Sequence, residues 1–446
     1  MSSIVYRVSE FLSRVVEGVR VGTNLDLYYL LWMLVSGRML ESRGAVIPGL
    51  SAFGLSDRAV RRSAAALTYG VWEIEPMVGN FRAEVEAEGR WKAHEHGGYR
   101  PVAADLVGFS RPKLLDCPTK HYCSTANKAL PAIVVGIAGA VGSVDDQRLA
   151  LPRVIVESDP KEPGEPALMK RLLRGVNFGL ALDEVMITDR GFPLLYFLEL
   201  GIKRYVKRDR ENFTARRADI HYKGRGRRPG QGDIVRPLSR TYNGRVIEST
   251  PADREESWEE GTDRGTSIRL RAAFWDNLVM EGHEAVFRCI VVWDPRYRRP
   301  LLLVTPLDLS ARELRRLYLD RWPIEGLPLV AKQMLGAHRQ FVSAEKSRTR
   351  LPMLALLSGA ILSYLSATER PVAAGFWDRS PRPTAGRLRR LLARVHFRDL
   401  PPLTHKLREK RSPTAHLLKG ILAHRRRKAT PDPDQNPTPN AIPLAA

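Results

Sequence analysis

Cysteine is scarce in this chain of 446 residues, and the three that occur, Cys117, Cys123 and Cys289, form no C-x-x-C pair. So few cysteines exclude a disulfide-stapled scaffold, and their spacing argues against a zinc knuckle. The N-terminus also lacks a basic stretch followed by an apolar run, so we expect no signal peptide. A reducing, cytoplasmic location is the resulting expectation.

Acidic residues are too few to balance the basic ones, since 49 Asp and Glu face 71 Lys and Arg and leave a net charge of +22. The excess is concentrated in two places. Residues 201–246 hold 14 Lys and Arg against 4 Asp and Glu, and residues 377–428 hold 16 against 3. Clustered positive charge predicts a polyanionic partner such as nucleic acid. The alternative is a pair of Arg-rich faces that only contact solvent.

A membrane partner is not expected. The uncharged run Ala129–Val144 has sixteen residues, but it includes Pro131 and three glycines. A spanning helix needs roughly 20 apolar residues. We interpret this run as a buried strand of a sheet.

The N-terminal 75 residues are predicted to be helical, because apolar residues recur there at helical spacing. The stretch Gly54–Arg62 resembles a short turn that leads into the recognition helix of a helix-turn-helix, with Ser56 as the N-cap. Any capped basic surface helix has the same pattern, so both interpretations stay open.

Short apolar runs then alternate with helical stretches, which predicts an α/β fold with a mixed sheet flanked by helices. Residues 212–300 are rich in Arg, Gly and Thr and predict a β-rich insertion, with an exposed loop at Gly224–Gly232. Ser310 and Glu313 form a capping-box pair that begins a helix. The predicted strands are 102–107, 120–126, 133–141, 185–188, 202–207 and 301–305, and the predicted helices are 166–178, 193–200 and 351–365.

The most informative segment runs from Tyr318 to Lys332. Tyr318, Arg321, Glu325 and Lys332 have offsets of 0, 3, 7 and 14 residues. On a continuous helix at roughly 100° per residue, all four share one face within a sector of about 60°. A carboxylate beside two cations and a phenol suits a metal ligand next to a phosphate backbone, although ordinary charge pairs on an exposed helix give the same pattern. Pro323 requires a bend or the start of a new helix.

The array Y-(2)-R-(3)-E-(6)-K resembles the signature of DDE transposases of the insertion-sequence-4 type. The resemblance implies that Glu325 is the third metal-binding carboxylate and that Tyr318, Arg321 and Lys332 contact DNA at the transposon end. It also implies a first Asp within the first sheet strand and a second near the end of the fourth. Asp105 and Asp189 stand at such places. Rival acids at less suitable places are Glu157, Asp159, Asp183 and Glu184.

This resemblance implies a ribonuclease-H-like catalytic domain made of residues 99–211 and 301–366, interrupted by the insertion at 212–300. A helical, DNA-binding N-terminal region (1–98), a basic C-terminal region (367–428) and a disordered tail (429–446) would complete the chain. The implied function is cleavage of double-stranded DNA at transposon ends and strand transfer into target DNA. Two Mg²⁺ ions, with Mn²⁺ as a substitute, and a homodimer in the synaptic complex are implied too. The alternatives are a domesticated or inactive DNA-binding protein and a metal-dependent nuclease of the same fold.

Further candidates remain outside the array. Some relatives flip a base onto a Trp of the insertion, and Trp293 or Trp275 would serve, although a lone Trp in a strand is more often part of the core. His94-Glu95-His96 is a candidate metal pair, against the alternative of a solvated loop. His121 and Tyr122 lie between the first two acids in the sequence and are candidates to line the site.

Overall fold

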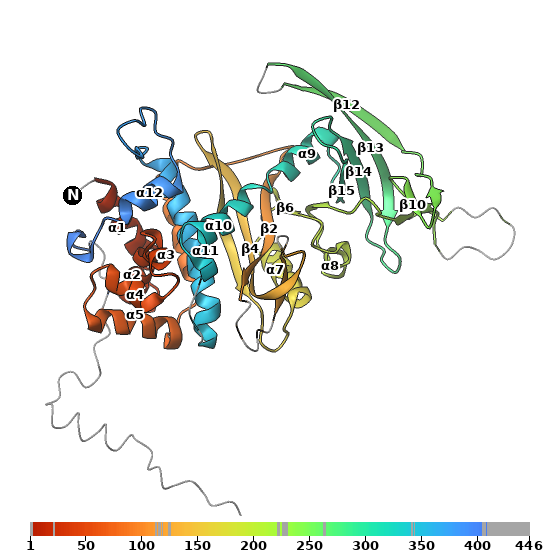
Figure 1. Cartoon of the computed structure of the whole chain (residues 1–446). Helices are drawn as coiled ribbons and strands as arrows, with labels where there is room; N and C mark the ends of the chain where they lie inside the picture. The colour runs from red at the N-terminus through yellow and green to blue at the C-terminus, as the bar shows by residue number, and fades with distance from the viewer. Residues whose placement is uncertain are drawn as a thin grey trace, which may run out of the picture.

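The computed structural model describes residues 3–20, 23–111, 114, 117, 119–123, 126–220, 224, 231–261, 265–339, 342, 344–403 and 407. The tail expected at 429–446, residues 408–428 of the second basic segment and most of the Gly224–Gly232 loop lie outside them. The described part is elongated, with helices at one end, a sheet in the middle and long antiparallel strands at the other end (Figure 1).

The helical end begins the chain and confirms the helical prediction for its first 75 residues. Its second helix is apolar on every side and is therefore buried among the others, against the long helix α11 (Glu345–Thr368). The predicted N-cap is also confirmed, because the Ser56 hydroxyl accepts a hydrogen bond from the Ala59 amide at 3.4 Å. The helices are α1 (Ser3–Val15), α2 (Asn24–Val35), α3 (Arg38–Glu41), α4 (Val46–Ala52), α5 (Asp57–Tyr69) and α6 (Glu75–Glu88).

One continuous mixed sheet crosses the described part of the molecule. Its central strands lie in the order β5-β4-β2-β6-β7, in which β2, β6 and β7 are parallel while β4 is antiparallel to both β2 and β5. The predicted α/β class with a mixed sheet flanked by helices is therefore confirmed. The strands are β1 (Lys92–Ala93), β2 (Arg100–Ser110), β3 (Lys120–Cys123), β4 (Lys128–Val144), β5 (Gln147–Glu157), β6 (Glu184–Thr188) and β7 (Tyr205–Arg208).

The strands of residues 212–305 extend this sheet, except for β10 (Arg240–Tyr242) and β11 (Arg245–Ile247), which form a separate two-stranded sheet. β15 pairs antiparallel with β7, and β14, β13 and β12 follow as antiparallel neighbours that project away from the helical end (Figure 1). These strands are β8 (Ala215–Arg217), β9 (Ile234–Val235), β10 (Arg240–Tyr242), β11 (Arg245–Ile247), β12 (Arg254–Gly261), β13 (Ser267–Val279), β14 (Phe287–Trp293) and β15 (Leu301–Thr305).

Helices cover both faces of the central sheet. Along β2, Ala103 and Val107 belong to the same core as α10 (Pro323–Gln333) and α11, whereas Val102 and Ala104 pack with α7 (Glu165–Phe178). This alternation is the two-residue period of a strand buried on both faces. The remaining helices are α8 (Leu194–Glu199), α9 (Ala311–Leu319) and α12 (Ala385–Leu392).

Two differences from the sequence prediction concern local geometry. Strand β5 was not predicted, because Pro152 and Arg153 interrupt its apolar residues. Gly139 pairs with Pro152 and Ala138 with Val154, so Arg153 forms a bulge that lets a proline lie inside the ladder. The helix that begins at Ser310 has both hydrogen bonds of the predicted capping box, but it ends at Leu319, and a new helix begins at Pro323.

Helix α11 is long and apolar enough by composition to cross a membrane. However, 89% of its most apolar window is buried inside the protein. It packs against α2, α5, α10, α12, β4 and β5. The surrounding protein therefore takes the place that lipid would have, and α11 is a core helix.

Candidate active site

The two candidate aspartates lie at the same edge of the central sheet. In the parallel pair β2–β6, Ala103 is opposite Ile187, so the same register places Asp105 opposite Asp189, directly after β6. Asp105 shares the strand face of Ala103 and Val107, which is the face that α10 covers. Asp189 follows Val185 and Ile187 at two-residue spacing, so it belongs to the same face of the sheet as these residues, which pack under α9. Both carboxylates therefore belong to the face covered by the α9–α10 segment.

Short-range hydrogen bonds fix both carboxylates. The Leu106 amide donates to Asp105 Oδ1 and the Gly191 amide donates to Asp189 Oδ1, each at 2.8 Å. The pKa of Asp105 rises to about 6, because burial and the nearby negative charge of Asp189 disfavour its ionised form, with a smaller contribution from Glu325. Two of the acids predicted from the sequence, Asp189 and Glu325, are therefore close enough to Asp105 to act on it electrostatically.

Glu325 reaches this group from the first turn of α10. Helix α9 ends one turn earlier, and Pro323 takes the first position of the new helix, where its missing amide hydrogen is not needed. The angular argument for one continuous helix is therefore wrong, because Tyr318 belongs to α9 whereas Glu325 and Lys332 belong to α10. The break still leaves Glu325 on the side of Asp105.

Arg321 lies in the break and connects the acids. Its guanidinium donates to Glu325 Oε1 at 2.5 Å and lies 3.7 Å from Asp105 Oδ2. Burial opposes its charge, but Tyr318, Glu325 and Asp105 more than offset this, and the pKa of Arg321 is raised. A fixed cation between two carboxylates offsets their repulsion, which is the electrostatic role that a bound metal ion also performs.

Two further cations flank the acids. Lys332 lies in the last turn of α10, and its Nζ is 5.4 Å from the ring centre of Phe109. Burial lowers the pKa of Lys332, and the negative charge of Asp105 opposes this shift. Lys207, on the far side, is nearly fully buried, donates to Asp209 Oδ2 at 2.7 Å and acts electrostatically on Asp189. Sequence reasoning missed Lys207, because nothing in its strand distinguishes it from an ordinary exposed lysine.

A pocket of about 340 Å³ opens beside Arg321. Tyr318, only 3% exposed, and the half-exposed Trp322 form part of its wall. Five arginines give the pocket a positive lining, although Arg315 and Arg321 are also paired with acids. The cationic lining residues are Arg208, Arg298, Arg299, Arg315 and Arg321.

The tryptophans named from the sequence lie elsewhere. Trp275 is buried in the core, where its indole donates to the Thr250 carbonyl at 3.0 Å. Trp293 shares the strand face of Val291, whereas the pocket is lined by Val292 on the opposite face, and the Arg271 guanidinium lies 4.4 Å from the Trp293 ring centre. Trp322 is the indole that lines the pocket, and its place beside Arg321 was visible in the sequence.

His121 and Tyr122 also lie apart from the acids. His121 Nδ1 is 2.6 Å from Glu165 Oε1 at the start of α7, and its ring packs over Gly108, which faces the α7 side of β2. Tyr122 is exposed and donates to Asn127 at 2.7 Å. Among the rival acids, Glu184 is buried and ion-paired with Arg153, and Asp183 is paired with Arg100 at the opposite end of β6.

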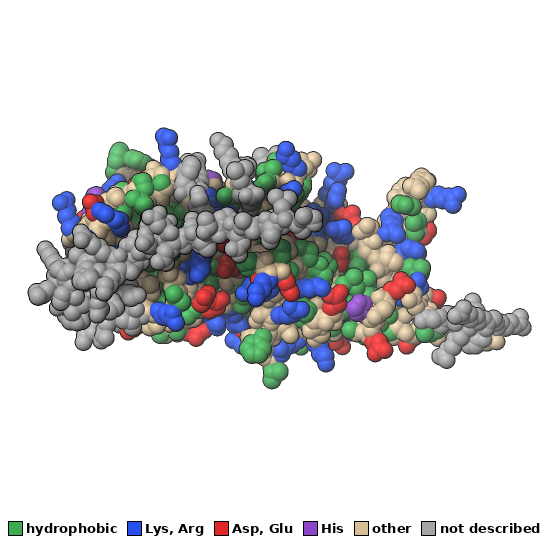
Figure 2. Space-filling model, turned by 90° about the horizontal axis from the view of Figure 1, so that it is seen from below, with side chains coloured by type: hydrophobic (Ala, Val, Ile, Leu, Met, Phe, Trp, Pro, Cys, Tyr) green, Lys and Arg blue, Asp and Glu red, His purple; other side chains and the backbone are tan. Residues whose placement is uncertain are grey.

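Figure 2 shows one face of the molecule, and Lys and Arg side chains are interspersed there with Asp and Glu. One basic residue of segment 201–246, Arg208, nevertheless lies next to the candidate site, because it lines the pocket. The described part of the second basic segment includes α12, whose last turn carries Arg389 and Arg390.

The donor set fits a divalent metal site. Carboxylate oxygens are the ligands that Mg²⁺ and Mn²⁺ prefer. Asp105 lies in β2, Asp189 directly follows β6 and Glu325 lies in α10, all on one side of the sheet. Burial and the charge of Asp189 raise the pKa of Asp105 even though Arg321 opposes the shift. Glu325 remains half-exposed, so solvent and a substrate have access to the group.

No family model matches the chain, and no curated protein matches its sequence. The functional argument therefore depends on the residues and geometry of the site itself.

Proposed function

We propose that this protein is a DDE-type transposase that cleaves DNA at transposon ends and joins the 3′ ends to target DNA. The observation that supports the proposal is that Asp189 and Glu325 both act electrostatically on Asp105, although Glu325 is 220 positions from Asp105 in the chain. Such convergence is what phosphodiester chemistry with divalent metal ions requires of its ligands.

We infer that the central sheet is ribonuclease-H-like. Three long antiparallel strands are followed by two parallel strands, each preceded by a helix, and Asp105 lies in the first long strand. Asp189 follows the fourth long strand, β6. This agrees with the places that the transposase resemblance assigns to the two aspartates, and the strands of residues 212–300 correspond to its insertion.

Each acid has a distinct task in this proposal. Two divalent ions would activate a water or a 3′-hydroxyl and stabilise the leaving oxygen. As the family resemblance implies, Asp105 would hold both ions, while Asp189 and Glu325 would each hold one. Because Asp105 has a raised pKa without metal, it must lose a proton as the site is loaded, and loading is therefore favoured as the pH rises through about 6.

The cations would hold DNA. Arg321 suits a phosphate because its planar guanidinium donates two parallel hydrogen bonds, and it already lines the positive pocket. Lys332 would contact the backbone as a point charge. Tyr318 and Trp322 in the same pocket wall would contact the terminal nucleotides, with Trp322 better placed for base stacking than Trp293. α5 with its Ser56 cap and the basic C-terminal region would add contacts to the same DNA, in a cytoplasmic homodimer that pairs two ends.

The test is cleavage and joining by the purified full-length chain. Supercoiled plasmids carrying the DNA that flanks the gene are incubated with Mg²⁺ or Mn²⁺, and the ends are mapped. We expect cleavage at both element ends followed by joining of 3′ ends to target DNA. Cleavage that is never followed by joining would favour the alternative, a metal-dependent nuclease. Binding with no cleavage under any metal would favour a domesticated DNA-binding protein.

A further inference from the structure

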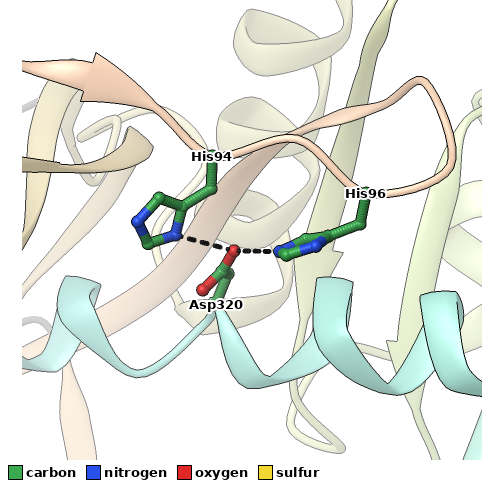
Figure 3. A group of neighbouring side chains, drawn as sticks. All are labelled: His94, His96 and Asp320. Carbon is green, nitrogen blue, oxygen red and sulfur yellow. Dashed lines mark hydrogen bonds and ion pairs between the residues drawn. The ribbon is translucent and has the colours of Figure 1, made fainter.

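A second group of metal-ligating side chains lies behind the α9–α10 break. His94 follows β1, His96 lies in the turn before β2, and Asp320 ends α9 (Figure 3). His94 Nδ1 is 3.0 Å and His96 Nε2 is 2.8 Å from the same atom, Asp320 Oδ2. The Asp320 side chain is 5% exposed and the two histidines are 22% and 21% exposed, so the group is mostly buried but solvent reaches the imidazoles.

The three ligand atoms are close enough together to bind one metal ion after small movements. They lie within 4.8 Å of one another, and both imidazole rings point their nitrogens at one carboxylate oxygen (Figure 3). Zinc bonds of about 2.0–2.2 Å at tetrahedral angles place ligand atoms about 3.3 Å apart. The observed separations are shorter by a few tenths of an ångström, and small side-chain rotations would admit an ion at the centre.

Neighbouring groups hold these ligands in position. The Ser143 hydroxyl lies 2.7 Å from His94 Nε2, so the outer ring nitrogen of His94 has its own partner while Nδ1 faces inward. Arg148 is ion-paired with the other carboxylate oxygen, Oδ1 of Asp320. Reciprocal backbone hydrogen bonds between His96 and Tyr99, at 2.9 and 3.0 Å, fix the turn that carries His96. Such outer partners orient metal ligands and fix the tautomer of a ligating histidine.

We propose that His94, His96 and Asp320 bind one Zn²⁺ ion, with water as the fourth ligand on the exposed side. Two imidazoles and one carboxylate select zinc or a similar transition metal over Mg²⁺, which prefers oxygen ligands. The ion would connect the segment before β2 to the α9–α10 break. Asp320 directly precedes Arg321, so the same ion would set the position from which Arg321 reaches Asp105 and Glu325.

The site is independent of the carboxylate group at the sheet edge. It uses no oxygen of Asp105, Asp189 or Glu325, and it would exist whether or not the chain is a transposase. Without metal, the same residues can form a purely hydrogen-bonded cluster, and the experiment must separate these two states.

Full-length protein treated with a chelator and dialysed is titrated with Co²⁺ and Zn²⁺. We expect one Co²⁺ per chain with the visible absorption of a tetrahedral site, its displacement by one equivalent of Zn²⁺, and a higher Tm in Zn²⁺. Millimolar Mg²⁺ should leave the Co²⁺ spectrum unchanged. The absence of a saturable site in the wild type would overturn the proposal.

The decisive variant is His96→Gln, because the glutamine amide can still donate to Asp320 but is a poor zinc ligand. We expect its metal-free Tm and circular dichroism to match the wild type, and its Co²⁺ affinity to fall by at least about 100-fold. Asp320→Asn should lose the ion as well. His121→Gln, on the opposite face of the sheet, and Asp105→Asn should both keep it. Unchanged binding in His96→Gln, or equal loss in His121→Gln, would contradict the site.

Discussion

Different side-chain groups lie on the two sides of the α9–α10 break. Their comparison shows how neighbouring residues of one irregular segment, Asp320 and Arg321, can contact two separate groups. On one side, the Arg321 guanidinium lies between Asp105 and the half-exposed Glu325. On the other side, Asp320 is buried between two imidazoles. The first site keeps an exposed acid and a carboxyl with a raised pKa, and the second has almost every polar atom paired. Such a difference agrees with the two proposals, a reacting site on one side and a structural metal site on the other.

The largest effect expected from this comparison is the loss of DNA cleavage when an acid of the Asp105–Asp189–Glu325 group is replaced. Asp189→Asn and Glu325→Gln should each lower Mg²⁺-dependent cleavage by more than about 1,000-fold while DNA binding stays measurable, since each replaces a carboxylate proposed to bind metal with a neutral amide of similar shape. Asp183→Asn, at the opposite end of β6, is the matched control and should cleave normally. An Asp189→Asn protein with full activity would remove that residue from the site.

Arg321 should matter next, because it joins the acids to the pocket. Arg321→Lys keeps the positive charge but loses the paired donors of the guanidinium, so we expect cleavage to fall by roughly 10–100-fold. A gel-shift assay with end-containing DNA should show weaker binding of Arg321→Lys than of the wild type. Equal activity in the lysine variant would mean that charge alone is required there. Arg271→Lys, next to Trp293 on the other strand face, serves as the control.

The raised pKa of Asp105 predicts that its ionisation lowers the free energy of unfolding. Its pKa in the metal-free folded chain is about 6 against an ordinary value of 3.8, so folding favours the protonated form. Its contribution is fully present below pH 3.8 and is lost as the pH rises through about 6. Asp105→Asn should therefore be more stable than the wild type at pH 8 in chelator, by up to about 2–3 kcal/mol. Urea unfolding at pH 8 and pH 4 measures this, and a difference that grows toward pH 4 would contradict it.

The smallest expected effect is on the free energy of unfolding, and it concerns the N-cap of α9, the helix that ends at the break. Ser310 caps α9: its hydroxyl accepts a hydrogen bond from the Glu313 amide, and the Glu313 carboxylate accepts one from the Ser310 amide. Ser310→Ala should lower the free energy of unfolding by about 1 kcal/mol. Ser51→Ala, an exposed serine within α4 that caps no helix, should change it by less than about 0.5 kcal/mol. Equal losses would show that the cap is not what stabilises α9.

Much of the central sheet could be predicted, because β2, β4 and β6 each contain an apolar run bounded by polar residues. β5 could not, since its Pro152 is tolerated only through a bulge opposite Ala138 and Gly139. Asp105, Asp189 and Glu325 were reached through motif resemblance and strand order. The third partner of His94 and His96 was out of reach, because Asp320 lies 224 positions from His96 and only tertiary contact joins them.

The central claim is that Asp105, Asp189 and Glu325 bind divalent metal ions together. Mn²⁺ binding to the protein–DNA complex, followed by electron paramagnetic resonance in the His96→Gln background, tests it most directly because the imidazole site is then removed. The account predicts two bound Mn²⁺ per chain, and loss of both when Asp105→Asn is added. The same two ions in the Asp105→Asn protein would contradict it.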